Sequence, residues 1–143
     1  MKKISEILRQ KNNRLISVPR EVTVYEALQI MMDHNISAIL VMEHDRLAGI
    51  FTERDYARKV VLLGKTSKTT PITEVMTSTG LYVISPDDSI EKCMEMMSSK
   101  HIRHLPVMEG DKVTGIVSIG DVVKFIIEDQ KHIIRELENY IST

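Results

Sequence analysis

The sequence is poor in cysteine and contains no long hydrophobic run. Its 143 residues include one cysteine, Cys93, so no intramolecular disulfide can form, and a reducing compartment suits the chain. No apolar stretch approaches the roughly 20 residues that a membrane-spanning helix needs. The first residues, MKKISEILRQK, carry lysines without an uninterrupted apolar run after them, so we expect no signal peptide. These absences predict a cytoplasmic protein without membrane contact.

An excess of one charge is also missing. The chain has 19 basic and 20 acidic residues, which argues against broad electrostatic binding to nucleic acid or to an anionic membrane. The five histidines form no obvious Ser/His/Asp arrangement. His101 and His104 lie three residues apart, but no cysteine or carboxylate completes a zinc site with them. We therefore expect neither an enzyme nor a metal protein.

What the sequence does contain is an internal duplication. Residues 23–55, TVYEALQIMMDHNISAILVMEHDRLAGIFTERD, align without a gap with residues 89–121, SIEKCMEMMSSKHIRHLPVMEGDKVTGIVSIGD, at a constant offset of 66 positions. Both copies end in glycine, two apolar residues, threonine or serine, two variable residues and aspartate. Duplicated units typically enclose clefts that suit small ligands, so the repeat indicates binding before catalysis.

Each copy predicts a helix followed by a strand hairpin and a second helix. Apolar residues at helical spacing predict the first helix of each copy, with Thr23 and Ser89 as N-caps. Cys93 aligns with Ala27, so we expect a small buried residue there. The turns at 43–46 and 109–112 contain His44 and Gly110, which tolerate positive φ. The apolar stripe of the first copy is Val24, Ala27, Leu28 and Met31, and that of the second copy is Ile90, Cys93, Met94 and Met97. The predicted strands are Ala38–Met42 and Leu47–Phe51 in the first copy and Leu105–Met108 and Val113–Val117 in the second. The second helix of each copy starts near Thr52 or Ser118.

Segments outside the aligned copies complete the organisation. The sequence predicts a leading helix at Ile4–Gln10, strands at Leu15–Val18 and Leu81–Ser85, and a last helix reaching about Ile141. We place the first repeat at about 13–63, a polar connector at about 64–76, the second repeat at about 77–128 and a helical extension at 129–143. The result is an α+β (α/β) fold with two strand-helix-strand-strand-helix repeats packed about a pseudo-twofold axis.

This pattern resembles the CBS domain pair, or Bateman module, over nearly the whole chain. The residues that carry the resemblance are the two closing motifs, Gly49–Asp55 and Gly115–Asp121. The segment Ile102–Val107 is similar to the second-repeat signature of the family, as seen in IMP dehydrogenase. The stretch TERDYARKV and the segment Met76–Val83 resemble those of small stand-alone bacterial CBS-pair proteins. The resemblance implies binding of adenine-containing ligands in the clefts between the repeats.

The resemblance also assigns roles to the closing motifs. Asp55 and Asp121 would accept hydrogen bonds from ribose hydroxyls, and Thr52 and Ser118 would donate to a phosphate oxygen. The chemistry agrees, because a carboxylate can hold a vicinal diol and a hydroxyl that opens a helix adds a donor beside free backbone N–H groups. The glycine of each motif would allow a close backbone approach within the hairpin.

The two predicted sites differ around the ligand. Arg103 and His104 align with Ser37 and Ala38, so we expect the Ser118/Asp121 site to be the better one. Arg54 and Arg58 lie four residues apart and could form an anion clamp or merely a solvated face; which site they serve is open. The remaining predicted contacts are Ile102 and Pro106 from the second-repeat motif, together with Ser37 and Ser85. Pro86 forces Ser85 into an extended conformation. By the resemblance, backbone groups of this strand edge would receive the adenine.

The sequence thus predicts a regulatory sensor of AMP, ADP, ATP or an NAD-type ligand, without a catalytic cofactor. The ligand would be read out through conformation or through assembly of a homodimer, for which the last helix offers an apolar surface. The effector protein is unknown, and the sequence does not distinguish S-adenosylmethionine from these nucleotides as the ligand. The alternatives are a structural oligomerisation module with vestigial clefts and, less favoured, a nucleotide hydrolase.

Overall fold

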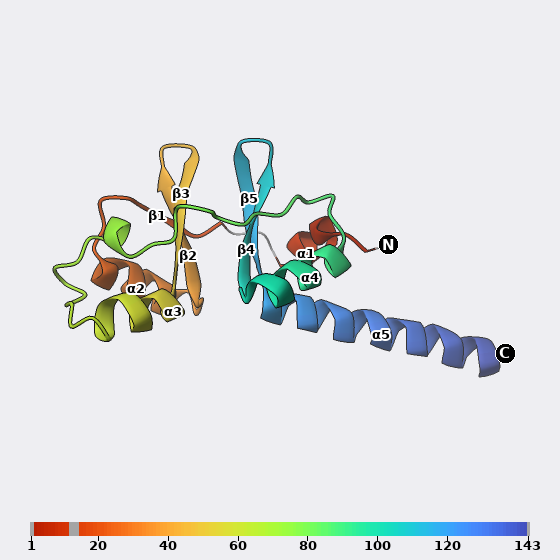
Figure 1. The fold of residues 1–143 in the computed structure, drawn as a ribbon. Coiled ribbons are helices and arrows are strands. Elements are labelled where there is room, and N and C mark those ends of the chain that lie inside the picture. The colour runs from red at the N-terminus through yellow and green to blue at the C-terminus, as the bar shows by residue number, and fades with distance from the viewer. Residues whose placement is uncertain (1, 12–14, 143) are drawn as a thin grey trace. The chain divides into compact units, whose positions relative to one another are not determined.

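The computed structural model describes residues 2–11 and 15–142 (Figure 1). The helices are α1 Ile4–Gln10, α2 Val24–Asp33, α3 Glu53–Asp55, α4 Ile90–Lys100 and α5 Ile119–Ser142; the strands are β1 Ser17–Pro19, β2 Ala38–Glu43, β3 Arg46–Thr52, β4 His104–Glu109 and β5 Lys112–Ser118. A π-helical segment, η1 Tyr56–Val61, follows α3, and a 3₁₀ turn, η2 Ile72–Glu74, lies in the connector. The predicted mixed helix and strand content is confirmed.

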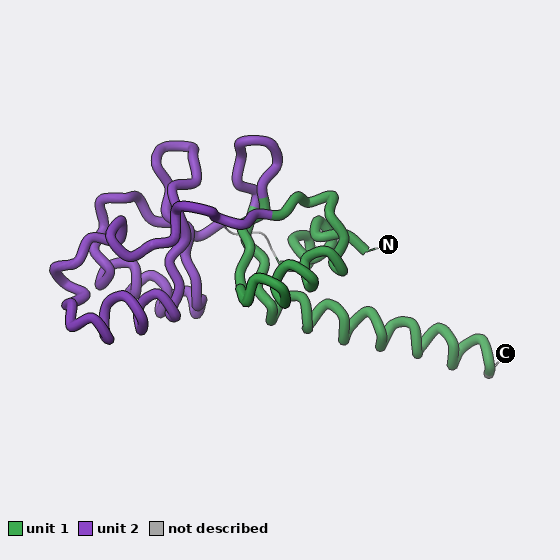
Figure 2. Tube along the Cα trace, viewed as in Figure 1, with its two compact units in different colours: residues 1–14, 84–107, 115–143 green, residues 15–83, 108–114 purple. Residues whose placement is uncertain are grey.

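The chain folds into two compact units (Figure 2). Unit 1 comprises residues 1–14, 84–107 and 115–143, and unit 2 comprises residues 15–83 and 108–114. Unit 2 therefore contains the elements of the first copy. The leading helix α1, α4, α5 and the helix-side ends of β4 and β5 belong to unit 1.

Unit 2 is built on a three-stranded sheet in which β1 pairs parallel with β2 and β2 pairs antiparallel with β3. The hairpin turn contains His44 at φ 56°, as predicted. The apolar stripe of α2 packs on this sheet, and Leu28 is half-buried against the same core. The fully buried members are Val18, Val24, Ala27, Met31, Ile39, Val41, Phe51, Val60, Ile72 and Val75.

Unit 1 repeats this core 66 positions later and adds α1 to it. Strands β4 and β5 form a two-stranded sheet, and their turn contains Gly110 at φ 63°. Cys93 occupies the place of Ala27, and both are fully buried, as predicted. The buried members are Ile4, Ile7, Leu8, Ile84, Ile90, Cys93, Met97, Leu105, Val107, Val117, Val122 and Phe125.

A hydroxyl side chain caps the first helix of each copy, α2 and α4, as predicted. The Glu26 amide donates to the Thr23 hydroxyl at 3.2 Å, and the Thr23 amide donates to the Glu26 carboxylate at 3.1 Å. The Ser89 hydroxyl accepts the Lys92 amide at 3.0 Å. Asn35 and His101, again 66 positions apart, follow these helices in the left-handed region with φ 52° and 55°.

Two predictions for the second copy are wrong. The sequence places Met94 on the buried stripe of α4, but 45% of it is exposed. On that helix the core of unit 1 buries Ile90, Cys93 and Met97 and packs against Met96 instead. The strand predicted at Leu81–Ser85 is reduced to a single parallel bridge between Ile84 and Val107. Pairing stops there because the Ser85 amide donates to the Asp88 carboxylate and Pro86 has no N–H.

Gly49 does allow a close backbone approach, but to the connector and not within its hairpin. A Cβ atom at Gly49 would lie 2.8 Å from the Thr77 carbonyl oxygen and 2.9 Å from Met76 Sδ. Thr77 pairs antiparallel with Ile50, whose amide donates to the Thr77 carbonyl at 3.0 Å. The Met-Thr segment that carried part of the resemblance thus pairs with the free edge of β3.

Candidate functional site

The two closing motifs adopt the same local structure, in which a hydroxyl and a carboxylate cap a helix start reciprocally. In unit 1 the Ser118 amide donates to Asp121 Oδ2 at 2.9 Å, and the Asp121 amide donates to Ser118 Oγ at 3.1 Å. In unit 2 the corresponding distances for Thr52 and Asp55 are 3.0 and 3.1 Å. A strand therefore turns into a helix at each motif, with the carboxylate folded back over the first turn.

The predicted flanking residues come next to these caps through backbone hydrogen bonds. The Ile119 amide donates to the Arg103 carbonyl at 2.9 Å, which places the loop before β4 at the start of α5. The Glu53 amide donates to the Ser37 carbonyl at 3.1 Å in the same way. The backbone of Arg103 thus lies next to the start of α5 in unit 1, and the backbone of Ser37 lies next to the start of α3 in unit 2.

Each motif aspartate also forms an ion pair with a lysine. Lys11 Nζ lies 2.8 Å from Asp121 Oδ2, and Lys59 Nζ lies 3.2 Å from Asp55 Oδ1. Both carboxylates are largely covered, with 22% and 13% of their side chains exposed. Neither lysine was predicted to pair with its aspartate. The four-residue spacing of Asp55 and Lys59 indicates such a pair on a helix, whereas no sequence pattern connects Lys11 with Asp121.

His104 is half-buried beside the ion pair of Lys11 and Asp121. Burial is the main cause that lowers the pKa of its imidazole, and the positive charges of Lys11 and Arg103 lower it further. The Asp121 carboxylate opposes this shift without cancelling it. The lowered pKa favours the uncharged form of the imidazole near pH 7.

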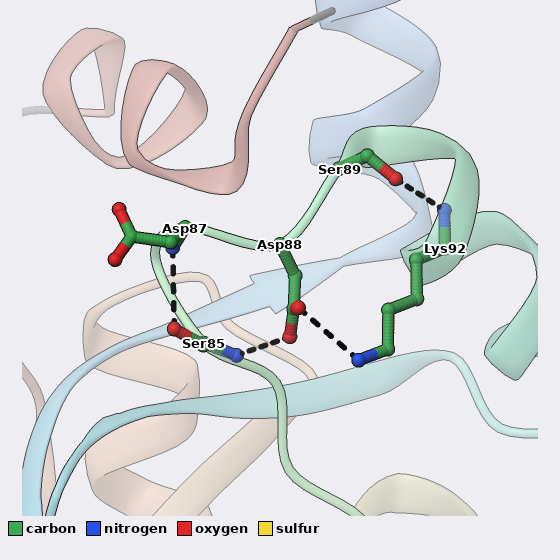
Figure 3. Close-up of polar contacts among 5 residues, drawn as sticks. All are labelled: Ser85, Asp87, Asp88, Ser89 and Lys92. Atoms are coloured by element: carbon green, nitrogen blue, oxygen red, sulfur yellow. Dashed lines mark hydrogen bonds and ion pairs between the residues drawn. The ribbon is translucent and has the colours of Figure 1, made fainter.

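The turn before α4 engages the backbone of Ser85 (Figure 3). Asp88 Oδ2 accepts the Ser85 amide at 2.9 Å, and the Ser85 carbonyl accepts the Asp88 amide at 3.1 Å. Lys92 Nζ donates to Asp88 Oδ1 at 3.1 Å. The bond from Ser85 is the largest cause that lowers the pKa of Asp88. Both backbone groups of Ser85 are thus engaged locally, at the position predicted to receive adenine.

The other predicted residues vary in exposure. Pro106 is buried in β4, and its carbonyl accepts the Ile84 amide at 3.0 Å; Ile102 is half-buried against the core of unit 1. Arg54 and Arg58 are both exposed in the helical segment that runs through α3 and η1.

An open hollow of about 510 Å³ lies along α5, lined by Ile119, Gly120, Val123, Lys124, Ile127, Glu128 and Lys131.

Metal-binding clusters and membrane-spanning helices are two further features that residues 2–11 and 15–142 lack. No group of three or more histidine, cysteine, aspartate or glutamate side chains in this range could hold a metal ion. No helix in the same range is both long and apolar enough to cross a lipid bilayer.

These features define a duplicated helix-and-strand module with one capped aspartate motif per copy, and comparison with known proteins identifies its family. The CBS domain model matches residues 4–62 and 72–128, so the chain belongs to the CBS domain family and contains two copies. CBS domain pairs are regulatory ligand-binding modules, and the relatives below are named as CBS-domain or signal-transduction proteins.

The chain is 38% identical over 124 residues to the mitochondrial CBS domain-containing protein CBSX3 of Arabidopsis thaliana, covering 84% of this chain and 60% of that protein. A putative signal-transduction protein with CBS domains from Burkholderia ambifaria superposes with a TM-score of 0.84 at 41% identity, covering 90% of this chain and 96% of that one. A hexameric CBS-CP12 protein from bloom-forming cyanobacteria superposes with a TM-score of 0.74 at 26% identity, covering 97% and 86%.

Proposed function

We propose that this chain is a regulatory module that binds an adenine nucleotide, AMP, ADP, ATP or NAD, at the start of α5. In this proposal Asp121 accepts hydrogen bonds from the ribose hydroxyls, and the Ser118 hydroxyl donates to a phosphate oxygen at the start of α5. Arg103 and neutral His104 flank the ligand. Ser85, Ile102 and Pro106 surround the base, with Ser85 contributing through its side chain or after its turn rearranges.

One observation carries the proposal: both copies build the same hydroxyl–carboxylate cap, and both carboxylates are largely covered. A cap by itself requires only the hydroxyl, since Ser89 begins α4 with no carboxylate returning to its own amide among the described hydrogen bonds. Aspartate adds an acceptor of fixed orientation, which a diol can use. In unit 2 the corresponding ligand contacts are Thr52, Asp55 and Ser37, with Arg54 and Arg58 binding an anionic group.

Readout through a homodimer is the second part of the proposal. The apolar side chains of α5 beyond the core of unit 1 are 47–82% exposed: Ile133, Ile134, Leu137, Tyr140 and Ile141. A second copy would cover them, and the hexameric cyanobacterial relative is a precedent for assembly within the fold. A nucleotide can shift such an equilibrium only by the difference in its affinity for the two states.

The test is a thermal-shift and calorimetry panel with AMP, ADP, ATP and NAD on the wild type, Asp121→Asn and Asp55→Asn. Asparagine keeps an acceptor for the cap but removes the charge. A ligand at about 100 times its dissociation constant adds about 2.7 kcal/mol, which raises the melting temperature by several degrees. We expect a shift with one ligand class, lost in Asp121→Asn. Loss only in Asp55→Asn would move the main site to unit 2.

The alternative is a structural oligomerisation module, which the exposed face of α5 favours. Absence of a shift with all four nucleotides would reject the sensor and support this alternative. A nucleotide hydrolase is tested by the same incubations, because it would release product.

A further inference from the structure

Both copies pair the motif aspartate with a lysine, and each lysine also donates to a backbone carbonyl. Lys11 Nζ donates to the Ile116 carbonyl at 2.7 Å, and Lys59 Nζ donates to the Val75 carbonyl at 3.2 Å. Each ammonium group is therefore held between a carboxylate and a backbone carbonyl. The arrangement recurs although the two lysines come from unrelated parts of the chain.

The duplication itself does not supply the second lysine. The position 66 residues after Lys59 is Phe125, which lies 93% buried as part of the core of unit 1. A lysine there would place a charge among apolar side chains. The second copy instead receives its ammonium group from Lys11, at the end of α1 and outside both aligned segments. The same ion pair thus exists in both copies by two different routes.

Helix α1 is anchored so that Lys11 can reach Asp121. Ile4, Ile7 and Leu8 are buried in unit 1, and the amides of Ile4 and Ser5 donate to the carbonyls of Asp88 and Pro86 at 3.0 Å. At the other end of α1, Lys2 Nζ lies 3.7 Å from Asp129 Oδ1 on α5. Two lysines of the α1 segment therefore face two aspartates of α5, and only Lys11 faces the motif aspartate.

The charge of Asp121 matters to any ligand that bonds to it through a sugar diol. The phosphate of such a ligand lies one sugar ring away, well within the roughly 8 Å over which charges interact at physiological salt. An unpaired carboxylate would repel that phosphate. Neutral His104 supplies no compensating charge, whereas the Lys11 ammonium group neutralises Asp121 directly.

We propose that Lys11 completes the unit 1 site as the cation that selects a phosphorylated nucleoside over the uncharged nucleoside, and that Lys59 has the same role in unit 2. This inference rests on the proposed nucleotide function and deepens it. It assigns a specificity role to a residue that precedes both aligned copies.

The test compares AMP with adenosine by isothermal titration calorimetry on the full chain, using wild type, Lys11→Met, Lys11→Arg and Lys59→Met. Lys2→Met is the matched control, because it removes the other lysine of the α1 segment that faces α5 and leaves Asp121 untouched. Lys11→Met should weaken AMP about tenfold, equivalent to about 1.4 kcal/mol, and change adenosine affinity less than about threefold. Lys11→Arg should restore most of the AMP preference, and Lys2→Met should alter neither affinity.

The outcomes separate the two proposals. Equal loss of AMP and adenosine in Lys11→Met would overturn the inference, since the lysine would then only orient Asp121. Tighter binding of both would also overturn it and show that Lys11 competes with the diol for the carboxylate. Wild-type protein that binds neither AMP nor adenosine would overturn the inference, whereas the nucleotide function is rejected only when none of the four nucleotides of the thermal-shift panel binds. An effect of Lys59→Met but not Lys11→Met would overturn the assignment to unit 1.

Discussion

At the scale of single residues, the most constrained position outside the candidate site is Gly49 in β3. Its missing side chain leaves room for the Met76–Thr77 segment, whose Thr77 carbonyl oxygen would lie 2.8 Å from a Cβ atom. Ile50 and Thr77 exchange two backbone hydrogen bonds at 3.0 and 2.9 Å next to this position. The glycine therefore ties the connector to the edge of the sheet.

Gly49→Ala should destabilise the protein by about 1–3 kcal/mol, because the Thr77 backbone and Met76 must move to accommodate the methyl group. Urea unfolding followed by circular dichroism measures this change. Gly120→Ala is the matched control: its Cβ atom would meet only Ser118 Oγ, at 3.6 Å, and alanine in a helix should be neutral or stabilising by up to about 1 kcal/mol. Equal stability of the two variants would contradict the packing role of Gly49.

At the scale of elements, the caps decide where the helices begin. Thr23 has a full capping box with Glu26, whereas Ser89 accepts only the Lys92 amide among its described bonds. Both hydroxyls satisfy a backbone N–H that has no partner within its helix. The polar residue before each apolar stripe thus fixes the residue at which the helix begins.

Thr23→Ala and Ser89→Ala should each lower the free energy of unfolding by about 1 kcal/mol, through loss of the cap at α2 and at α4. Chemical denaturation measures both, and Thr23→Ser, which keeps the hydroxyl, should retain most of the stability. A loss in Thr23→Ser as large as in Thr23→Ala would show that the threonine methyl group, not the cap, stabilises this helix.

At the scale of the whole molecule, the C-terminal part of α5 extends past the core of unit 1. Val122 and Phe125 are buried, but the apolar side chains from Ile133 onward are about half exposed or more. An isolated helix end of this length is marginal in water, so its burial against a second copy would stabilise it. This is the physical basis of the proposed homodimer.

A homodimer through α5 predicts a melting temperature that rises with protein concentration and a mass near twice 16.3 kDa. Light scattering after size-exclusion chromatography measures the mass. Leu137→Glu should give a monomer whose melting temperature is independent of concentration. Glu138→Ala on the same helix turn is the control and should remain dimeric. A wild-type mass of one chain at micromolar concentration would contradict the proposal.

Much of the local structure was predictable because short-range physics decides it. Helix α1 has the predicted bounds, and His44 and Gly110 adopt positive φ where the two hairpins turn. The resemblance to CBS pairs is confirmed by two matches of the family model. The Ser118–Asp121 cap follows from a spacing of three residues, which places hydroxyl and carboxylate on one helix turn.

The sequence by itself determined the duplication, the helix starts, the turns and the positions of the two aspartates, since each depends on residues a few positions apart. Only the tertiary structure decided what those aspartates contact. Lys11 and Asp121 are separated by 110 positions, and only the packing of α1 in unit 1 brings them to 2.8 Å. The exposure of Met94 and the pairing of Thr77 with Ile50 were decided in the same way, because long-range packing determines which apolar face and which strand edge is covered.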